Sequence, residues 1–291
     1  YVLMANAHPP ETRSRALAFF GTSQIVGIAV GGSLSGFIAE AFHWRVSFFL
    51  FGGLGLCFAL PLAYFFRTLP GSFSAGGSRK EPASFASVPS LFRIPSLCIA
   101  ISFVTVAAFG LSLVHTWLPT FIYDKFRLGL AGAGFEASVY PQVGQGLGLL
   151  IGGWLADVLA RRTKAARFLV VMIGFYAIAP YIFLLGQSDT LAATRAAALG
   201  FGLFAGFIAV NQALASFEVV PASLRATTVG LLNLVGCCVA GFAPFMGGLA
   251  RRTIGVDQLM TFTAVMYLLT GFAVLYAIRY HFQRDHARAS E

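Results

Sequence analysis

Hydrophobic residues in this chain form long continuous runs, separated by short polar turns. About 20 helical residues cross a hydrocarbon core of ~30 Å, and the runs lack the alternation that barrel strands require. The pattern therefore predicts an all-α polytopic membrane protein. A partial span, Tyr1–Ala7, comes first. The eight expected full spans are approximately Leu17–Ala39, Arg45–Phe66, Leu97–Ile122, Ala133–Leu159, Phe168–Gly186, Leu191–Phe217, Ala226–Ala250 and Gln258–His281.

One connection is long enough to link two bundles of helices. Residues 68–96 are rich in Gly, Ser and Pro and include Arg79, Lys80 and Glu81, which is typical of a linker. The linker leaves residues 1–67 as the end of a first bundle and residues 97–291 as a second bundle with six spans. If both bundles have six helices, the first lacks its opening helices, and we expect an N-terminal part to precede Tyr1.

Composition agrees with lipid as the solvent, because 57% of the residues are hydrophobic and only 11% are charged. The net charge of +9 lies in short loops and not on a polar face, which argues against nucleic-acid binding. Of the 20 Lys and Arg residues, fourteen fall on the side of the turn that contains Arg161, Arg162, Lys164 and Arg167. The positive-inside rule therefore places this turn, residues 68–96 and the C-terminus in the cytoplasm, and the protein in the cell (inner) membrane.

No motif for a metal, a nucleotide or an enzymatic reaction is present in the sequence. The four cysteines, Cys57, Cys98, Cys237 and Cys238, lie in apolar runs without metal-ligand spacing. GxxxxGK[ST], HExxH and GxSxG are absent as well. We expect no cofactor and no enzymatic activity. An integral membrane enzyme remains a weaker alternative, because it would need a cluster of acids, bases or metal ligands at one membrane face.

Polar side chains at membrane depth indicate which spans face a wet cavity, since such groups are costly in lipid. The second, fifth and eighth spans contain no acid, base or amide in their interiors. The first, fourth, sixth and seventh spans contain amides, and these are the predicted substrate-binding residues: Gln24, Gln142, Gln145, Asn211, Gln212 and Asn233. For each amide the alternative is a hydrogen bond between helices without a substrate.

Two ring side chains in the third span are further candidates. His115 lies well inside the span and is a candidate to carry a coupling proton, because its reference pKa of about 6.5 is close to physiological pH. The alternative is a neutral histidine that is hydrogen-bonded to a neighbour. Trp117 either stacks on a substrate or belongs to the aromatic belt at the membrane interface.

The segment Gly153–Arg162, GWLADVLARR, resembles the loop signature of the major facilitator superfamily, Gly-x-x-x-Asp followed by closely spaced Arg and Lys. It departs from the signature at Val158, where the family usually has Arg, and at Ala160, where it often has Gly. It is therefore similar to the weaker second copy of the signature, between helices eight and nine. Thr116-Trp117-Leu118-Pro119 resembles the end of helix seven in organic-anion symporters and in spinster-like members.

This resemblance implies two six-helix bundles and alternating access, with a small organic anion as substrate, a proton as coupling ion and a monomer as working unit. It also implies that Asp157, with Arg161 and Arg162 beside it, acts as a latch against the helix that starts near Leu17 and carries Arg13 and Arg15. The alternative is that the cations only fix topology. A truncated remnant that does not transport is the other alternative for the chain.

Overall fold

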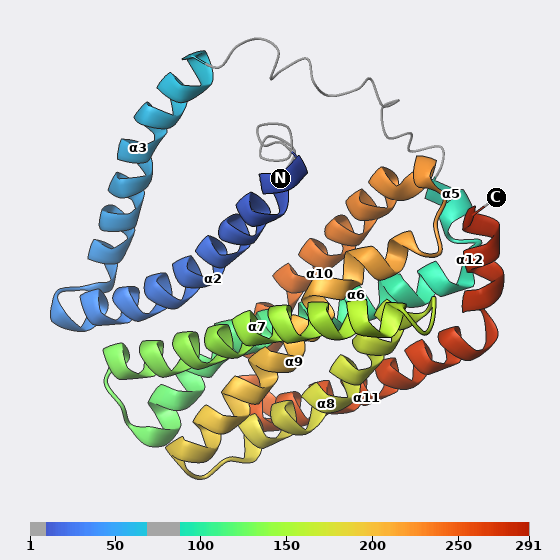
Figure 1. The fold of residues 1–291 in the computed structure, drawn as a ribbon. Helices are drawn as coiled ribbons and strands as arrows, with labels where there is room; N and C mark the ends of the chain where they lie inside the picture. Colours follow the sequence, from blue (N-terminus) through green and yellow to red (C-terminus); the bar gives the residue numbers. More distant parts are fainter. Residues whose placement is uncertain (1–9, 69–87, 291) are drawn as a thin grey trace.

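The computed structural model describes residues 10–68 and 88–290, with the backbone alone for residues 10–21 (Figure 1). Within these residues, eight helices are long and apolar enough to cross a membrane and no strand occurs, which confirms the predicted fold class. The partial span and most of the linker lie outside the described residues. The eight helices are α2 (Pro10–Ala41), α3 (Trp44–Thr68), α6 (Pro95–Phe126), α7 (Leu130–Ala160), α8 (Ala166–Gln187), α9 (Leu191–Phe217), α10 (Arg225–Thr253) and α11 (Val256–Tyr280).

Local signals explain where several helices begin and end. Pro95 occupies the first turn of α6, where its missing N–H costs nothing, and α6 stops before Arg127, which has a left-handed φ of 52°. The side chain of Thr190 accepts a hydrogen bond from the Ala193 N–H at 3.2 Å and so caps α9.

Three short helices were not predicted: α5 (Val88–Leu91), η2 (Ala222–Leu224) and α12 (Phe282–Ser290). The first of them shortens the predicted linker, because α5 lies within residues 68–96. The last follows α11 and is amphipathic, with Phe282 buried in the core. We attribute the omission of α12 to its short length and its many charges, which resemble an ordinary polar tail in the sequence.

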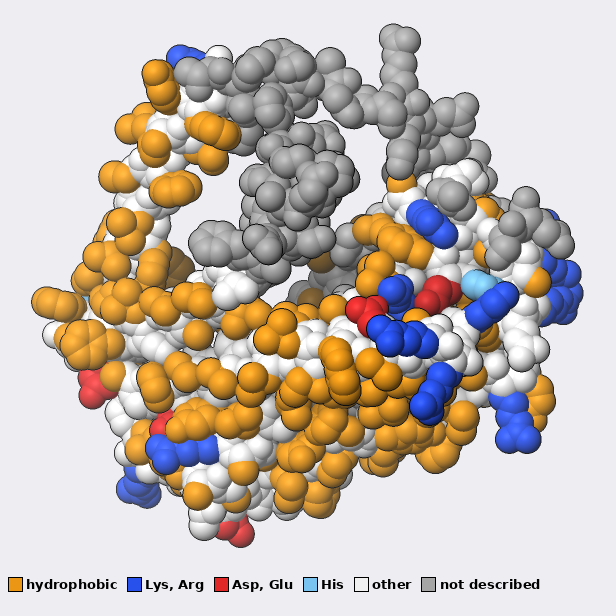
Figure 2. All heavy atoms as spheres, viewed as in Figure 1, with side chains coloured by type: hydrophobic (Ala, Val, Ile, Leu, Met, Phe, Trp, Pro, Cys, Tyr) orange, Lys and Arg blue, Asp and Glu red, His pale blue; other side chains and the backbone are white. Residues whose placement is uncertain are grey.

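The helix connections lie at two opposite ends of the molecule, and these ends correspond to the two sides predicted from the loops (Figure 1). We call the end with the α2–α3, α6–α7 and α8–α9 connections the Trp44 face. The end with the α7–α8 turn, the start of α6 and α12 is the Arg161 face. Figure 2 shows hydrophobic side chains covering the sides of the long helices and Lys and Arg side chains gathered at the Arg161 face.

The core lies among α6, α8 and α11 and is rich in aromatic rings. Phe103 meets Phe168 edge to face with ring centroids 6.2 Å apart, and Phe175 meets Tyr267 at 5.1 Å. The Tyr267 hydroxyl donates to the Ala107 carbonyl oxygen at 3.1 Å, so a polar group in the core is satisfied by a backbone acceptor. This aromatic contact fixes the helices behind the cavities described below.

Glycines allow α7 and α9 to approach closely. A Cβ atom added to Gly148 would overlap the carbonyl group of Leu203, and one added to Gly206 would lie 2.6 Å from the Gln145 carbonyl oxygen. Small residues of this kind let membrane helices pack through their backbones, where lipid offers no hydrophobic driving force. The α7–α9 pair is therefore held by close backbone packing.

The helix α2 packs antiparallel to α7 through small residues at the Trp44 face. Gly32 lies against Ser138, and an added Cβ on Gly36 would lie 2.6 Å from the Leu130 carbonyl oxygen. Toward its N-terminal end α2 leaves α7 (Figure 1). The two helices are thus close at the Trp44 face and apart at the Arg161 face.

Gly148→Ala is expected to destabilise the protein, while Gly146→Ala, two residues earlier in α7, is expected to be neutral or slightly stabilising. The added methyl group at Gly148 meets backbone of α9, which cannot move aside, whereas the nearest atom at Gly146 is Ile25 Cδ1 at 3.9 Å. Overpacking costs about 1–3 kcal/mol, and Gly to Ala in an open helix position gains up to about 1 kcal/mol. Apparent melting temperatures in detergent measure the difference, and equal values for the two variants would contradict the packing.

Candidate functional site

Three of the predicted amides and His115 line one cavity of about 440 Å³, which we call the α10 cavity. Gln145 comes from α7, Gln212 from α9 and Asn233 from α10, while His115 comes from α6. The hydroxyl groups of Ser112 and Thr116, which the sequence analysis did not select, line it as well. Four helices therefore bring neutral polar groups to one place.

The amides of the α10 cavity have unused hydrogen-bonding capacity. Among the described residues, the side chains of Gln145, Gln212 and Asn233 form no hydrogen bond to protein, and each remains partly or fully exposed. A primary amide offers two donors and one acceptor oxygen. The cavity can therefore form several hydrogen bonds with a polar solute. Within the part of the chain that the structure describes, no Lys, Arg, Asp or Glu lines it.

Asn211 differs from this group, although it precedes Gln212 directly. Its Nδ2 donates to the carbonyl oxygens of Gly152 at 3.3 Å and Phe207 at 3.0 Å, and its side chain is buried between α7 and α9. The sequence placed Asn211 at membrane depth in the sixth span but could not show which way it points. Asn211 and Gln212 point in different directions because successive helix positions lie about 100° apart. The Asn211 side chain forms a hydrogen bond between helices.

Gln142 and His115 form a pair between two cavities. Gln142 Nε2 donates to His115 Nε2 at 3.2 Å, which requires the histidine tautomer with an unprotonated Nε2. Gln142 is 1% exposed, and its Oε1 atom has no hydrogen-bond partner among the described residues. His115 lines both the α10 cavity and a larger one, so this pair lies at the boundary between the two spaces.

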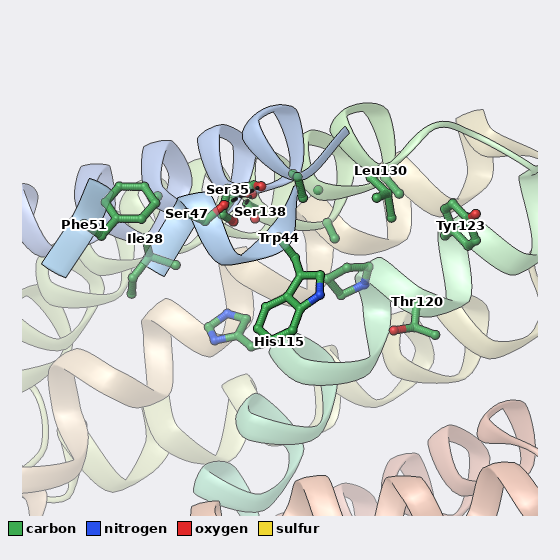
Figure 3. Close-up of a pocket in the computed structure, with 18 of the residues that line it drawn as sticks. Ile28, Ser35, Trp44, Ser47, Phe51, His115, Thr120, Tyr123, Leu130 and Ser138 are labelled. Atoms are coloured by element: carbon green, nitrogen blue, oxygen red, sulfur yellow. Dashed lines mark hydrogen bonds between the residues drawn. The ribbon is translucent and has the colours of Figure 1, made fainter. Parts of the chain in front are cut away.

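The larger space, which we call the α3 cavity, has a volume of about 1020 Å³ and lies between α2, α3, α6 and α7. Figure 3 shows aromatic rings on its walls, Trp44 and Phe51 from α3 and Tyr123 from α6, together with the His115 ring. Its polar wall includes Ser47, whose hydroxyl donates to the Ser35 carbonyl oxygen at 3.3 Å (Figure 3). This cavity is mainly apolar and contacts the α10 cavity at His115.

The remaining predicted contacts to a substrate lie elsewhere. The Trp117 Nε1 donates to the Pro244 carbonyl oxygen at 3.1 Å, and its ring packs on Gly247. The ring therefore joins α6 to α10, and the two roles foreseen for Trp117 stay predictions. Gln24 is exposed on α2 and lines neither cavity.

A proline explains one polar contact beside the α10 cavity. Pro244 in α10 lacks the N–H that would bond to the carbonyl oxygen of Ala240, four residues earlier. The Ser112 hydroxyl of α6 donates to this oxygen at 2.6 Å. Ser112, His115 and Thr116 share one helix face at spacings of three and four, a signal that was present in the sequence.

Sequence reasoning did not find the ion pair between Glu136 and Arg195. Arg195 of α9 binds both carboxylate oxygens of Glu136 in α7, with Nε 2.8 Å from Oε2, and its guanidinium lies 5.6 Å from the centre of the Tyr140 ring. The Glu136 side chain is 8% exposed. Neither residue lines the α10 cavity or the α3 cavity, so we assign the pair to holding α7 against α9. It could not be foreseen because 59 residues separate the partners.

The comparisons with known proteins agree with this arrangement. A family model described as Major Facilitator Superfamily matches residues 1–244, which is most of the chain. The chain belongs to the major facilitator superfamily.

Curated relatives in the superfamily are named as transporters. The chain is 25% identical over 256 residues to the probable L-galactonate transporter of Escherichia coli K12, covering 82% of this chain and 55% of the relative. It is 24% identical over 284 residues to the hexuronate transporter of Bacillus subtilis 168, covering 94% of this chain and 65% of the relative. The chain thus spans about half to two thirds of the length of these relatives.

A solved structure shows the same fold. A bacterial homologue of the human lysosomal transporter Spinster, in an inward-facing and unoccupied conformation, matches with a TM-score of 0.68. The match covers 98% of this chain and 74% of the other chain, at 17% sequence identity.

The superfamily signature lies at the Arg161 face. Asp157 is exposed near the end of α7, and Arg161 and Arg162 are exposed in the following turn. Among the described side chains, Asp157 has no hydrogen bond or ion pair. The side chains of Arg13 and Arg15 lie outside the described residues, and the latch between them and Asp157 stays a prediction.

Glu218 lies beside the signature and has an unusual environment. It follows α9 at the Arg161 face, and its Oε2 atom is buried without a hydrogen-bond partner among the described residues. Burial raises the pKa of Glu218 from 4.5 to about 7, although Arg167, with its Nε 3.8 Å from Oε1, lowers it in part. The backbone carbonyl of Glu218 is hydrogen-bonded to His286 Nδ1 of α12 at 2.7 Å. Desolvation thus outweighs the nearby cation at this site.

Glu218→Gln is expected to stabilise the protein above pH 7 and to have little effect near pH 4.5. Since the folded state holds the proton more tightly, native stability falls as pH rises from about 4.5 to about 7, and the neutral Gln avoids this loss. Apparent melting temperatures of wild type and Glu218→Gln between pH 4.5 and 8 measure this stability difference. Asp189→Asn is the control, because the Asp189 carboxylate is 91% exposed. A variant whose difference from wild type did not change with pH would contradict this prediction.

Proposed function

We propose that this chain forms part of a secondary transporter that moves a small organic anion of the sugar-acid class by alternating access. The observation that carries the proposal is the α10 cavity. Gln145, Gln212 and Asn233 present unpaired amides from three helices, next to His115. Such convergent donors and acceptors match a polyhydroxylated solute, whose hydroxyl groups each need a partner once water is removed.

The relatives support the substrate class. Both are named for sugar acids, L-galactonate and hexuronate, and each combines hydroxyl groups with a carboxylate. The described residues of the α10 cavity include no Lys or Arg, so they are suited to the hydroxyl groups. A cation for the carboxylate would come from helices of the first bundle.

The proposed topology follows from the distribution of cations. Arg161, Arg162 and Lys164 are exposed at the Arg161 face, and their density there favours the cytoplasm of a bacterial-type inner membrane for this face. Residues 1–67 would belong to the first bundle and residues 97–291 to the second. Asp157 would then close the cytoplasmic side by accepting hydrogen bonds from the N-terminal end of α2.

Gln212→Ala is expected to raise the KM for a transported sugar acid by about tenfold, while Asn211→Ala leaves the KM unchanged and lowers thermal stability. Loss of one hydrogen bond to a neutral solute group costs about 0.5–1.5 kcal/mol, which is up to about tenfold, and Asn211 points away from the cavity. Initial rates of uptake into proteoliposomes containing the whole transporter measure both variants. A raised KM in Asn211→Ala and not in Gln212→Ala would reverse the assignment.

His115→Gln is expected to abolish accumulation driven by a proton gradient while exchange of labelled for unlabelled substrate continues. We assign the coupling proton to His115 because its ring faces both cavities and contacts Gln142 at 3.2 Å. The test compares galactonate and hexuronate uptake with and without an inward proton gradient. Uptake that needs no gradient in the wild type would exclude proton coupling, and no uptake of any sugar acid would exclude the substrate class.

A further inference from the structure

Glu40 joins the two sets of helices on either side of the linker. It lies one residue before the end of α2, and its Oε2 accepts a hydrogen bond from the backbone N–H of Ala131 in α7 at 2.7 Å. Its Oε1 is close to Gly129, since a Cβ atom added to that glycine would lie 2.6 Å away. The carboxylate therefore sits over the first turn of α7 at the Trp44 face.

The N-terminus of α7 has no cap of its own. The N-cap residue is Gly129, which has no side chain, and the first turn contains no acidic residue. The first N–H groups of any helix lack partners within the helix and carry partial positive charge. Glu40 supplies both the hydrogen-bond acceptor and the negative charge, as an N-cap residue would, but from another helix.

The packing of α2 on α7 is tightest in the turns next to Glu40. Gly36 meets the Leu130 carbonyl oxygen, and an added Cβ on Gly134 would lie 3.0 Å from the Gly32 carbonyl oxygen. Further along, α2 separates from α7 (Figure 1). The Glu40 contact thus lies at the end where the helices meet, and any motion that opens the Trp44 face between α2 and α7 must break it.

We propose that Glu40 is the latch of the Trp44 face, which holds this face closed by capping α7 and releases the cap when the face opens. This inference rests on the alternating access proposed above. The latch resembles the one predicted for Asp157 in its physical basis, a carboxylate against a helix N-terminus, but it acts at the opposite face and with the donor and acceptor helices exchanged.

The test measures how readily the space behind the latch is reached from each side of the membrane. Ser138→Cys places a thiol in the wall of the α3 cavity, beside Gly32. The whole transporter, with its native cysteines replaced, is labelled with a membrane-impermeant maleimide in vesicles of both orientations. Glu40→Ala is expected to raise the labelling rate from the Trp44 face by about fivefold. This is the factor by which the loss of a typical N-cap changes an equilibrium constant.

Asp189→Ala is the matched control, because it also removes one carboxylate from the Trp44 face but pairs with Lys125, at 3.2 Å, and does not touch α2. It is expected to label at the unaltered rate. Glu40→Gln keeps a hydrogen-bond acceptor and loses the charge, so we expect a smaller rise in the labelling rate, of about twofold. If Glu40→Ala does not fold, the labelling rate of Glu40→Gln tests the latch.

An unchanged labelling rate in folded Glu40→Ala and Glu40→Gln would overturn the latch, as would an equal rise in Asp189→Ala. The labelling needs no substrate. A raised rate in a protein that transports no sugar acid would therefore keep the latch and remove the proposed substrate class, whereas normal transport with an unchanged rate would remove the latch alone.

Discussion

Hydrocarbon offers no hydrogen-bond partner, and the positions of the polar side chains in this protein follow from that constraint. Ser112, Trp117 and Asn211 all direct their polar atoms to backbone carbonyl oxygens of neighbouring helices. Once these groups are satisfied, the amides of Gln145 and Gln212 remain without protein partners and face the α10 cavity. The candidate site is thus the set of polar groups that the helix packing does not use.

The same constraint determines how the helices are held together. Lipid is as apolar as a leucine side chain, so helices gain little by burying apolar surface and must gain from close contact. At Gly148 and Gly206 the backbones of α7 and α9 are so close that a methyl group would not fit between them. The Glu136–Arg195 ion pair adds a charged contact between the same helices. In the proposed alternating access, a rigid α7–α9 pair would carry Gln145 and Gln212 as one unit.

Carboxylates at helix ends connect packing to motion. Glu40 caps α7 across the α2–α7 contact at one face, and Asp157 is exposed at the other face, near the separated ends of the same two helices. A cap formed between two helices has modest strength, about 1 kcal/mol, so thermal motion and substrate binding can both shift it. Contacts of this strength suit the alternating access proposed above, which requires two populated states.

The sequence by itself determined the fold class, the eight spans and the loops that share a side, because long apolar runs and charge counts are local properties. It also identified the amides of the α10 cavity, since amides at membrane depth are rare and stand out. It missed the short helices α5, η2 and α12, because the first two have only three or four residues and α12 is short and highly charged.

The tertiary structure decided which polar groups are free. Asn211 and Gln212 are adjacent in sequence and equally deep, but their side chains point in different directions. Asn211 forms a hydrogen bond between helices, whereas Gln212 lines the α10 cavity. Trp117 and Glu40 found their partners in the same way, on helices distant in the chain, and His115 found its partner on the next helix. Such pairings depend on how rigid helices rotate and pack against each other, and a helix in lipid can present a polar residue to any neighbour that offers an acceptor.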